Sequence, residues 1–207
     1  MSALFRSRQI GMLQVDLNLH SQLSNAMAPG LVMEAKMELA NHLERHLLLQ
    51  RLRCLAWAGD GGIFWIECLR ESDFDAVVLA GESVFQVLGS VNALYADRFP
   101  ERQRMTLRVS GHYGSILTVR EPRFWHGKEL NFFAKHEREL SAPAMFAITK
   151  QLRDMLSQEQ RMKFPEGRRL ARQIVGETVY VYFHRGFGDF PPVLRDADVA
   201  SLHSSLR

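Results

Sequence analysis

The strongest constraint on the fold is a short glycine-rich segment between two apolar runs. Residues 59–62 (Gly-Asp-Gly-Gly) separate residues 51–58 from residues 63–69, and both flanking runs carry apolar and aromatic side chains. Two strand-like runs joined by a short Gly/Asp turn predict a β-hairpin. Long helical patterns lie on both sides of this hairpin, so the chain is expected to pack helices against a sheet.

The other expected elements follow from periodicity and turn residues. Residues 10–19 alternate apolar side chains and predict a strand, and residues 31–50 repeat Leu or Ala every four positions and predict an amphipathic helix. A second long helix is expected to be capped by Ser72 or Asp73 and to stop before Pro100. The remaining expectations are a strand over 105–119 broken by its glycines, a helix over 129–140, a strand over 145–149, a helix over 151–158, a basic loop over 159–172 and a strand over 178–183.

This order predicts an α+β fold, with helices packed over a largely antiparallel sheet and a ferredoxin-like βαββαβ core. We expect one domain over residues 10–185, a short N-terminal segment over residues 1–9 and a tail over residues 186–207.

Composition excludes several classes of protein. The chain has 207 residues, of which 46% are hydrophobic, so it is not a disordered or low-complexity chain. Its net charge of +3 argues against a dedicated nucleic-acid binder. Cys54 and Cys68 lie in apolar runs without a CxxC spacing, and neither a signal peptide nor 18 uninterrupted apolar residues occur. We therefore expect a reduced, cytoplasmic protein without a membrane span.

Two aspartates are the candidate chemical groups. Asp16 lies near the end of an apolar strand, where an acid needs a partner, and Asp60 lies at the hairpin tip. Two carboxylates that meet at one edge repel each other unless a cation lies between them, and such hard oxygen ligands suit Mg²⁺ or Mn²⁺. For Asp60 alone, ordinary turn chemistry is the competing interpretation.

At these residues the chain resembles the catalytic domain of class III nucleotide cyclases. The matching segments are VDLNLHSQLS at 15–24, AGDGG at 58–62, LRVSGHYGSI at 107–116, the set Gly127, Asn131 and Lys135, and MFAIT at 145–149. The resemblance covers about residues 10–185. It implies the class III cyclase fold and an enzyme that converts a nucleoside triphosphate into a 3′,5′-cyclic nucleotide and pyrophosphate.

The resemblance also implies roles for individual residues. Asp16, Asp60 and the Leu17 carbonyl would hold two divalent cations (Mn²⁺ or Mg²⁺). Asn131 would orient the ribose, and Lys135 stands where the family has an arginine that steadies the phosphate. The family builds its sites between two catalytic domains, which implies a homodimer.

Several roles stay open. Arg138 competes with Lys135 for the phosphate, and Arg169 or Arg172 could contact the triphosphate, although a solvated basic loop is the favoured interpretation of that segment. For Asn131 the alternative is a polar residue at a helix start, and for Lys135 it is a solvated helix face.

The positions that read adenine in the family are Ala56 and Phe124 here, and neither can hydrogen-bond a base. The resemblance is therefore greatest to stand-alone pyrimidine cyclases of bacterial antiphage (Pycsar) systems, whose cyclic nucleotide acts on a separate effector. Trp57 or Phe124 would narrow the pocket against purines, with core packing as the alternative. We expect UTP as substrate, with a cytidylate or adenylate cyclase, or an inactive nucleotide-binding module, as alternatives.

Overall fold

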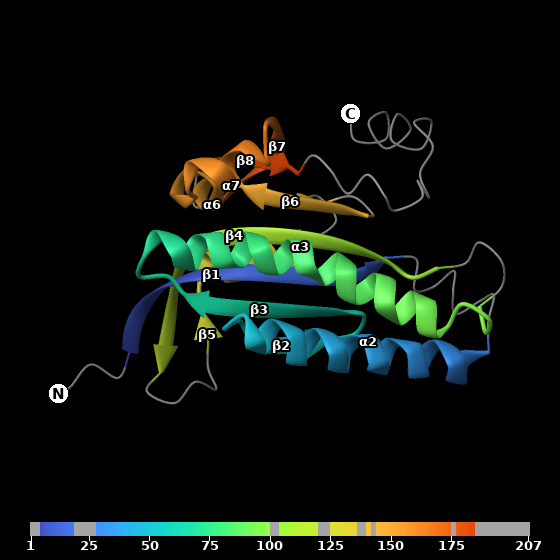
Figure 1. Ribbon diagram of the computed structural model, residues 1–207. Helices are drawn as coiled ribbons and strands as arrows, with labels where there is room; N and C mark the ends of the chain where they lie inside the picture. Colours follow the sequence, from blue (N-terminus) through green and yellow to red (C-terminus); the bar gives the residue numbers. More distant parts are fainter. Residues whose placement is uncertain are drawn as a thin grey trace.

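A single mixed β-sheet forms the centre of the protein, shown in the computed structural model of Figure 1. The structure describes residues 5–18, 28–99, 104–119, 125–135, 140–141, 144–174 and 177–184. The elements, in chain order, are β1 (Phe5–Asn18), α2 (Pro29–Leu49), β2 (Arg53–Ala58), β3 (Gly61–Glu67), α3 (Glu71–Leu94), β4 (Thr106–Val119), β5 (Trp125–His126), α4 (Lys128–Lys135), β6 (Met145–Thr149), α6 (Lys150–Met155), α7 (Gln158–Met162), β7 (Glu166–Ile174) and β8 (Glu177–Phe183).

The strands are ordered β2-β3-β1-β4-β6-β8-β7, and β5 pairs with β4 outside this path. The β4–β6 pair is parallel, and the other pairs are antiparallel. The first six elements follow the predicted βαββαβ order, with β2 and β3 joined by the expected hairpin. The predicted α+β fold class is therefore confirmed.

Helices α2 and α3 cover one face of the sheet (Figure 1). The buried positions of α2 are Val32, Ala35, Leu39, Leu43 and Leu47, which form one stripe because they recur every three or four residues. This stripe matches the predicted one except at its first turn, where Val32 replaces the half-buried Leu31. The opposite face carries a second, smaller apolar cluster beneath α4.

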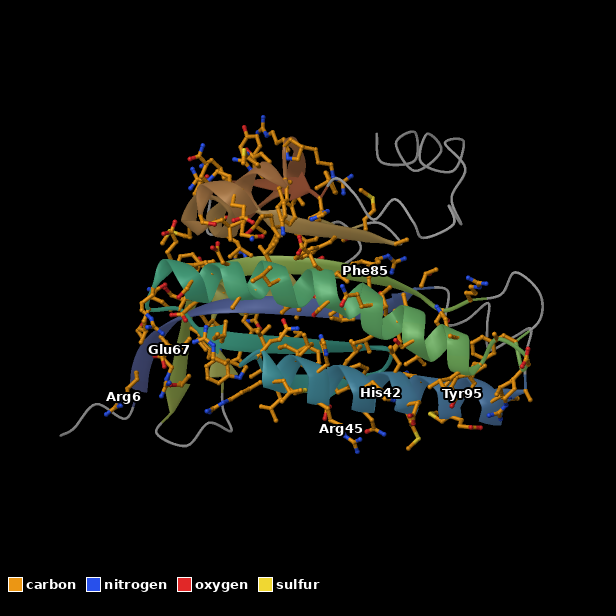
Figure 2. All side chains as sticks on the ribbon, viewed as in Figure 1. Arg6, His42, Arg45, Glu67, Phe85 and Tyr95 are labelled. Atoms are coloured by element: carbon orange, nitrogen blue, oxygen red, sulfur yellow. The ribbon has the colours of Figure 1, made fainter. Side chains whose placement is uncertain are left out.

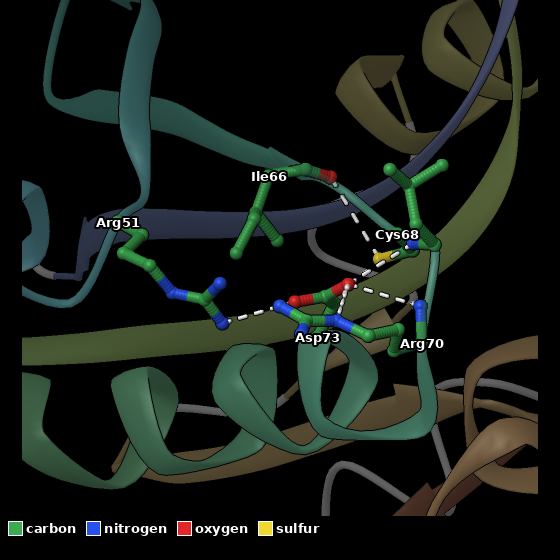
Figure 3. A network of polar contacts seen from close by, with 6 residues as sticks. Arg51, Ile66, Cys68, Arg70 and Asp73 are labelled. Atoms are coloured by element: carbon green, nitrogen blue, oxygen red, sulfur yellow. Dashed lines mark hydrogen bonds and ion pairs between the residues drawn. The ribbon is translucent and has the colours of Figure 1, made fainter.

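The start of α3 differs from the prediction. The helix begins at Glu71, so neither Ser72 nor Asp73 is its N-cap. Asp73 instead lies in the first turn, where its carboxylate accepts backbone N–H groups from Leu69 at 3.1 Å and Arg70 at 3.0 Å (Figure 3). Arg51 donates to the other carboxylate oxygen at 3.0 Å. The buried acid thereby satisfies the two backbone donors that directly precede the helix, one of them at the N-cap.

By length and hydropathy alone, α3 could cross a membrane, but 61% of its most apolar window is buried within the fold. The apolar surface of α3 is therefore largely used by the core.

Two predictions about the second half of the chain were wrong. The glycines of β4 do not interrupt it, because at Gly111 the missing side chain lets Leu152 and Ile148 pack against the strand. The basic segment 159–172 is not a loop: it contains α7 and most of β7, which forms the edge of the sheet beside β8. Basic side chains suit an edge strand, since their charge discourages pairing with another chain.

Candidate active site

The hairpin tip and the end of β1 form one corner of the sheet. Asp16 lies opposite Gly61 of β3, and the Leu17 N–H donates to the Asp60 carbonyl oxygen at 2.9 Å. A Cβ on Gly61 would lie 2.9 Å from the Val15 carbonyl oxygen and 3.3 Å from Asp16 Oδ1. Glycine at this position therefore allows the hairpin to approach the Asp16 carboxylate closely.

The Leu17 carbonyl points into the same corner. In an antiparallel ladder, a residue directs its N–H and its C=O toward the same neighbouring strand. Because the Leu17 N–H reaches Asp60, its carbonyl also faces the hairpin. The structure thus brings the backbone of Leu17 and Asp60 and the side chain of Asp16 to one corner.

A fourth residue belongs to this corner and was not predicted. Arg108 of β4 lies opposite Asp16 and donates from Nη1 to Asp16 Oδ2 at 2.9 Å. The Arg108 and Asp16 side chains are only 17% and 5% exposed. An acid inside an apolar strand signalled that a partner was needed, but only the β1–β4 register identifies it.

The donor set of the corner fits a hard divalent cation. Two carboxylates and one carbonyl are oxygen ligands of the kind that Mg²⁺ and Mn²⁺ prefer. Asp16 Oδ1 lies beside the hairpin while Oδ2 faces Arg108, so a cation would approach the Oδ1 side. Within the described ranges, no group of three or more His, Cys, Asp or Glu residues could hold a metal ion. A metal ion at this corner would therefore need backbone or substrate oxygens in addition to the two aspartates.

Helix α4 presents a second set of predicted residues. Asn131 and Lys135 are exposed and lie one turn apart, so they share a helix face. The opposite face of α4 buries Phe132 and Phe133 against the sheet.

His112 supports α4 from below. Its ring is buried, stacks on Phe133 at a centroid distance of 5.6 Å, and shares a hydrogen bond of 2.8 Å between Nδ1 and Thr149 Oγ1. Burial lowers the pKa of His112 to about 4, so the ring is neutral near pH 7. A neutral ring is compatible with its stacking beneath the helix.

Within one chain, Asn131 and Asp16 lie beside opposite halves of strand β4. The start of α4 lies over Gly114, where an added Cβ would overlap Glu129. Asp16 pairs with Arg108, six positions earlier on β4, which corresponds to about 20 Å along the strand. One chain therefore does not bring the two aspartates and the α4 pair to the same nucleotide.

The predicted base-contacting residues lie on two different faces. Trp57 packs over Gly62 and meets Phe64 edge-on, with ring centroids 6.2 Å apart, on the face covered by α2 and α3. Neighbouring strand residues point to opposite faces, so Ala56 shares the Asp16 face. This placement favours core packing for Trp57 and leaves Ala56 exposed beside the candidate site.

The other predicted contacts are less fully described. Phe124 and Arg138 lie outside the described residues, as does the side chain of Arg172 in β7. Arg169 is exposed on β7, a strand that contacts α4. Arg169 therefore lies on a strand next to Asn131 and Lys135 rather than in the Asp16 corner.

No protein-family model matches the sequence, and no curated protein is significantly similar to it. Solved structures do match the fold. The guanylyl cyclase Cya2 superposes with a TM-score of 0.75 at 16% identity, over 90% of this chain and 96% of that one. This chain has the fold of class III nucleotide cyclase domains.

Two further cyclase structures agree. The adenylyl cyclase CyaB from P. aeruginosa matches with a TM-score of 0.72 at 12% identity, over 88% of this chain and 96% of that one. The guanylyl cyclase domain of the RhoGC fusion protein from Blastocladiella emersonii matches with a TM-score of 0.64 at 11% identity, over 87% and 98% of the two chains. The cyclase fold predicted from the sequence is therefore confirmed across most of the chain.

Proposed function

We propose that the protein is a metal-dependent nucleotidyl cyclase that acts as a homodimer. The observation that carries this proposal is the corner formed by Asp16, Leu17 and Asp60, placed on a cyclase fold. Asp16 already has Arg108 as a partner, but a second carboxylate at the same corner adds negative charge that a divalent cation would offset.

The second half of the site comes from the α4 end of another copy. A two-fold dimer in which this end faces the partner's Asp16 corner would form two equivalent sites, each with residues from both chains. The RhoGC cyclase domain is known as a non-canonical dimer and also as a monomer. Self-association of this chain is accordingly part of the proposal.

In this dimer, each of the site residues would bind or position one part of the nucleotide. Asn131 orients the ribose, while Lys135 places a positive charge beside the phosphates as a point charge. Asp16, Asp60 and the Leu17 carbonyl would hold two divalent cations, which would supply charge neutralisation for the phosphates and favour ionisation of the ribose 3′-hydroxyl. The 3′-hydroxyl loses its proton to solvent and its oxygen bonds to the α-phosphorus, while the bond from that phosphorus to the bridging oxygen breaks and pyrophosphate leaves. Positioning and charge neutralisation supply most of the rate enhancement.

We further propose a pyrimidine substrate, with UTP favoured. Ala56 lies on the site face and offers no hydrogen bond to a purine, in place of the polar side chain that reads adenine in the family. The product, cyclic UMP, would act in the cytoplasm as an antiphage messenger that a separate effector binds. Cytidylate and adenylate cyclase activity are the alternatives for the base.

Incubation with each of ATP, GTP, CTP and UTP in the presence of Mn²⁺ tests the reaction, with the cyclic products resolved by liquid chromatography and mass spectrometry. We expect cyclic UMP, and we expect Asp60→Asn to abolish its formation. Asp97→Asn, at an exposed aspartate that is not one of the predicted site residues, is the matched control and should retain full activity. The proposal fails if no triphosphate yields a cyclic product, or if Asp60→Asn is as active as the control.

Mixing two inactive variants tests the composite site. In an equimolar mixture of Asp60→Asn and Asn131→Ala chains, half of the dimers carry one chain of each kind and hence one intact site. Activity should therefore recover to about a quarter of the wild-type value in a two-fold dimer. A mixture as inactive as its components would show that the two sets of residues do not act across an interface.

One observation favours a second candidate, a nucleotide-binding module without turnover. Arg108 holds Asp16 Oδ2 in a nearly buried ion pair, and such a pair can replace a metal as the charge partner. This module would bind nucleotide and dimerise without forming product. Calorimetric binding of UTP together with the activity assay distinguishes the two candidates.

A further inference from the structure

A pocket of about 280 Å³ lies where β2 begins and β3 ends, far from the Asp16 corner. Its lining residues are Arg8, Arg51, Arg53, Trp65, Ile66 and Glu67. Arg8 lies eight positions before Asp16 on β1, which corresponds to about 26 Å along the strand. Within one chain, this pocket is therefore separate from the candidate metal ligands.

Three arginines dominate the charge of the pocket. Arg8 Nη1 contacts Glu67 Oε2 at 2.9 Å, and Arg51 is held by Asp73 from outside the pocket (Figure 3). Among the described residues, Arg53 forms no ion pair, so its charge is not compensated. Figure 2 shows Glu67 at this end of the sheet, together with Arg6 of β1.

A second observation concerns a hydrogen-bond donor of Arg8 that has no acceptor among the described residues. The Nε of Arg8 is buried and has no hydrogen-bond partner among the described residues. A buried donor without a partner is costly, and its pairing with a ligand recovers that cost. The orphaned donor lacks an acceptor, and the exposed Arg53 guanidinium, which lines the same pocket, has no ion-pair partner among the described residues.

The pocket is also partly preorganised. Arg51 has a positive φ of 69° directly after α2, and its backbone N–H donates to the Leu48 carbonyl at 2.9 Å. Asp73 then fixes the guanidinium at 3.0 Å. Less side-chain freedom is lost on binding when a contact group is already held in place.

We propose that this pocket binds the phosphate group of a small molecule. Guanidinium groups match the geometry of phosphate oxygens through paired N–H donors, which is why arginine is preferred at such sites. Arg8, Arg51 and Arg53 supply the donors, of which Arg51 is the one already held in place, and Trp65 and Ile66 supply an apolar wall. The site is assigned independently of the cyclase reaction, since it needs neither metal nor turnover.

Isothermal titration calorimetry of the whole chain in metal-free buffer tests this site, with inorganic phosphate and uridine 5′-monophosphate as separate probes. We expect saturable binding of at least one probe, weakened about tenfold or more in Arg53→Gln, because a charged hydrogen bond is lost. Tighter binding of uridine monophosphate than of phosphate would identify a nucleotide ligand, and equal binding would identify a free phosphate.

Arg45→Gln is the matched control, because Arg45 is an exposed arginine on the outer side of α2 (Figure 2) and should leave binding unchanged. Arg53→Lys keeps the positive charge but loses the paired N–H donors of the guanidinium, so this variant should bind the probe with intermediate affinity. Unchanged melting temperatures establish that the variants fold. Absence of saturable binding in the wild type, or an Arg53→Gln affinity equal to that of Arg45→Gln, overturns the proposal. Activity of the cyclase site bears on neither result.

Discussion

Replacing Arg108 with glutamine removes the cation that holds Asp16 in the metal-free protein. The ion pair is 2.9 Å long, and its side chains are only 17% and 5% exposed, so solvent screens it little. A hydrogen bond to a charged group contributes about 1.5–3 kcal/mol, so Arg108→Gln should lower the free energy of unfolding by about 2 kcal/mol. For a chain of this length, such a loss lowers Tm by roughly 4–8 °C.

Divalent cations should reverse this loss if Asp16 is a metal ligand. Saturation at 100 times Kd adds about 2.7 kcal/mol to the folded state, which is close to the loss expected from the mutation. Wild-type protein should gain less from Mn²⁺, because the Arg108 guanidinium on Oδ2 repels a cation that binds the same carboxylate.

Differential scanning fluorimetry with EDTA and with MnCl₂ measures both effects. Arg98→Gln is the control, since it breaks the exposed Arg98–Glu34 pair, which involves none of the predicted metal ligands, and should not change the response to Mn²⁺. Asp16 is not a metal ligand of the kind proposed if Mn²⁺ raises the Tm of Arg108→Gln by no more than it raises that of the wild type.

Three further substitutions or treatments test the fold around the site. Asp73→Asn should cost about 1–3 kcal/mol near pH 7, because the carboxylate accepts two backbone N–H groups and pairs with a guanidinium. Burial raises the pKa of Asp73, but these bonds outweigh it and lower the pKa overall, so the cost in urea denaturation should shrink as pH falls below about 4. Gly81→Ala should cost about 1–3 kcal/mol because its methyl would overlap the Phe146 ring, whereas Gly89→Ala on the same helix meets no atom within 4 Å and should add about 0.5–1 kcal/mol. The Cys68 thiol, whose pKa burial raises to about 12, should resist alkylation at pH 8 until the protein is denatured, as followed by mass spectrometry.

Each of these expectations has a contrary result. A constant difference between Asp73→Asn and wild type from pH 7 to pH 3 would mean that the carboxylate charge is not what stabilises the turn. Equal stabilities of the two alanine variants would show that α3 can shift away from the sheet. Rapid alkylation of native Cys68 would show that the core around it opens readily.

The sequence predicted those elements whose signal is local. The hairpin follows from its glycines and α2 from its four-residue repeat, so both appear where expected. In contrast, the sequence of β7 shows no regular apolar alternation, and its strand conformation is fixed by antiparallel pairing with β8. A basic segment without apolar alternation predicts a loop, and only the pairing with β8 distinguishes it from an edge strand.

The site was predictable only in part for a related reason. The pairing of Asp16 with Asp60 follows from hairpin geometry and from the family resemblance, whereas the pairing with Arg108 depends on a register between strands far apart in sequence. Likewise, the alternation that places Trp57 on the helix-covered face depends on a bulge in β2, which no local residue pattern indicates.

The long ladder between β1 and β4 has a consequence for synthesis of the chain. Asp16 and Arg108 are 92 residues apart, so a ribosome that adds about 5–20 residues per second needs roughly 5–18 s to pass from one to the other. During that interval β1 can pair with β3, while its second edge waits for a strand that is not yet made. An unpaired edge is a template for another chain. Translational pausing between β3 and β4 would therefore extend the period in which nascent chains are most prone to aggregate.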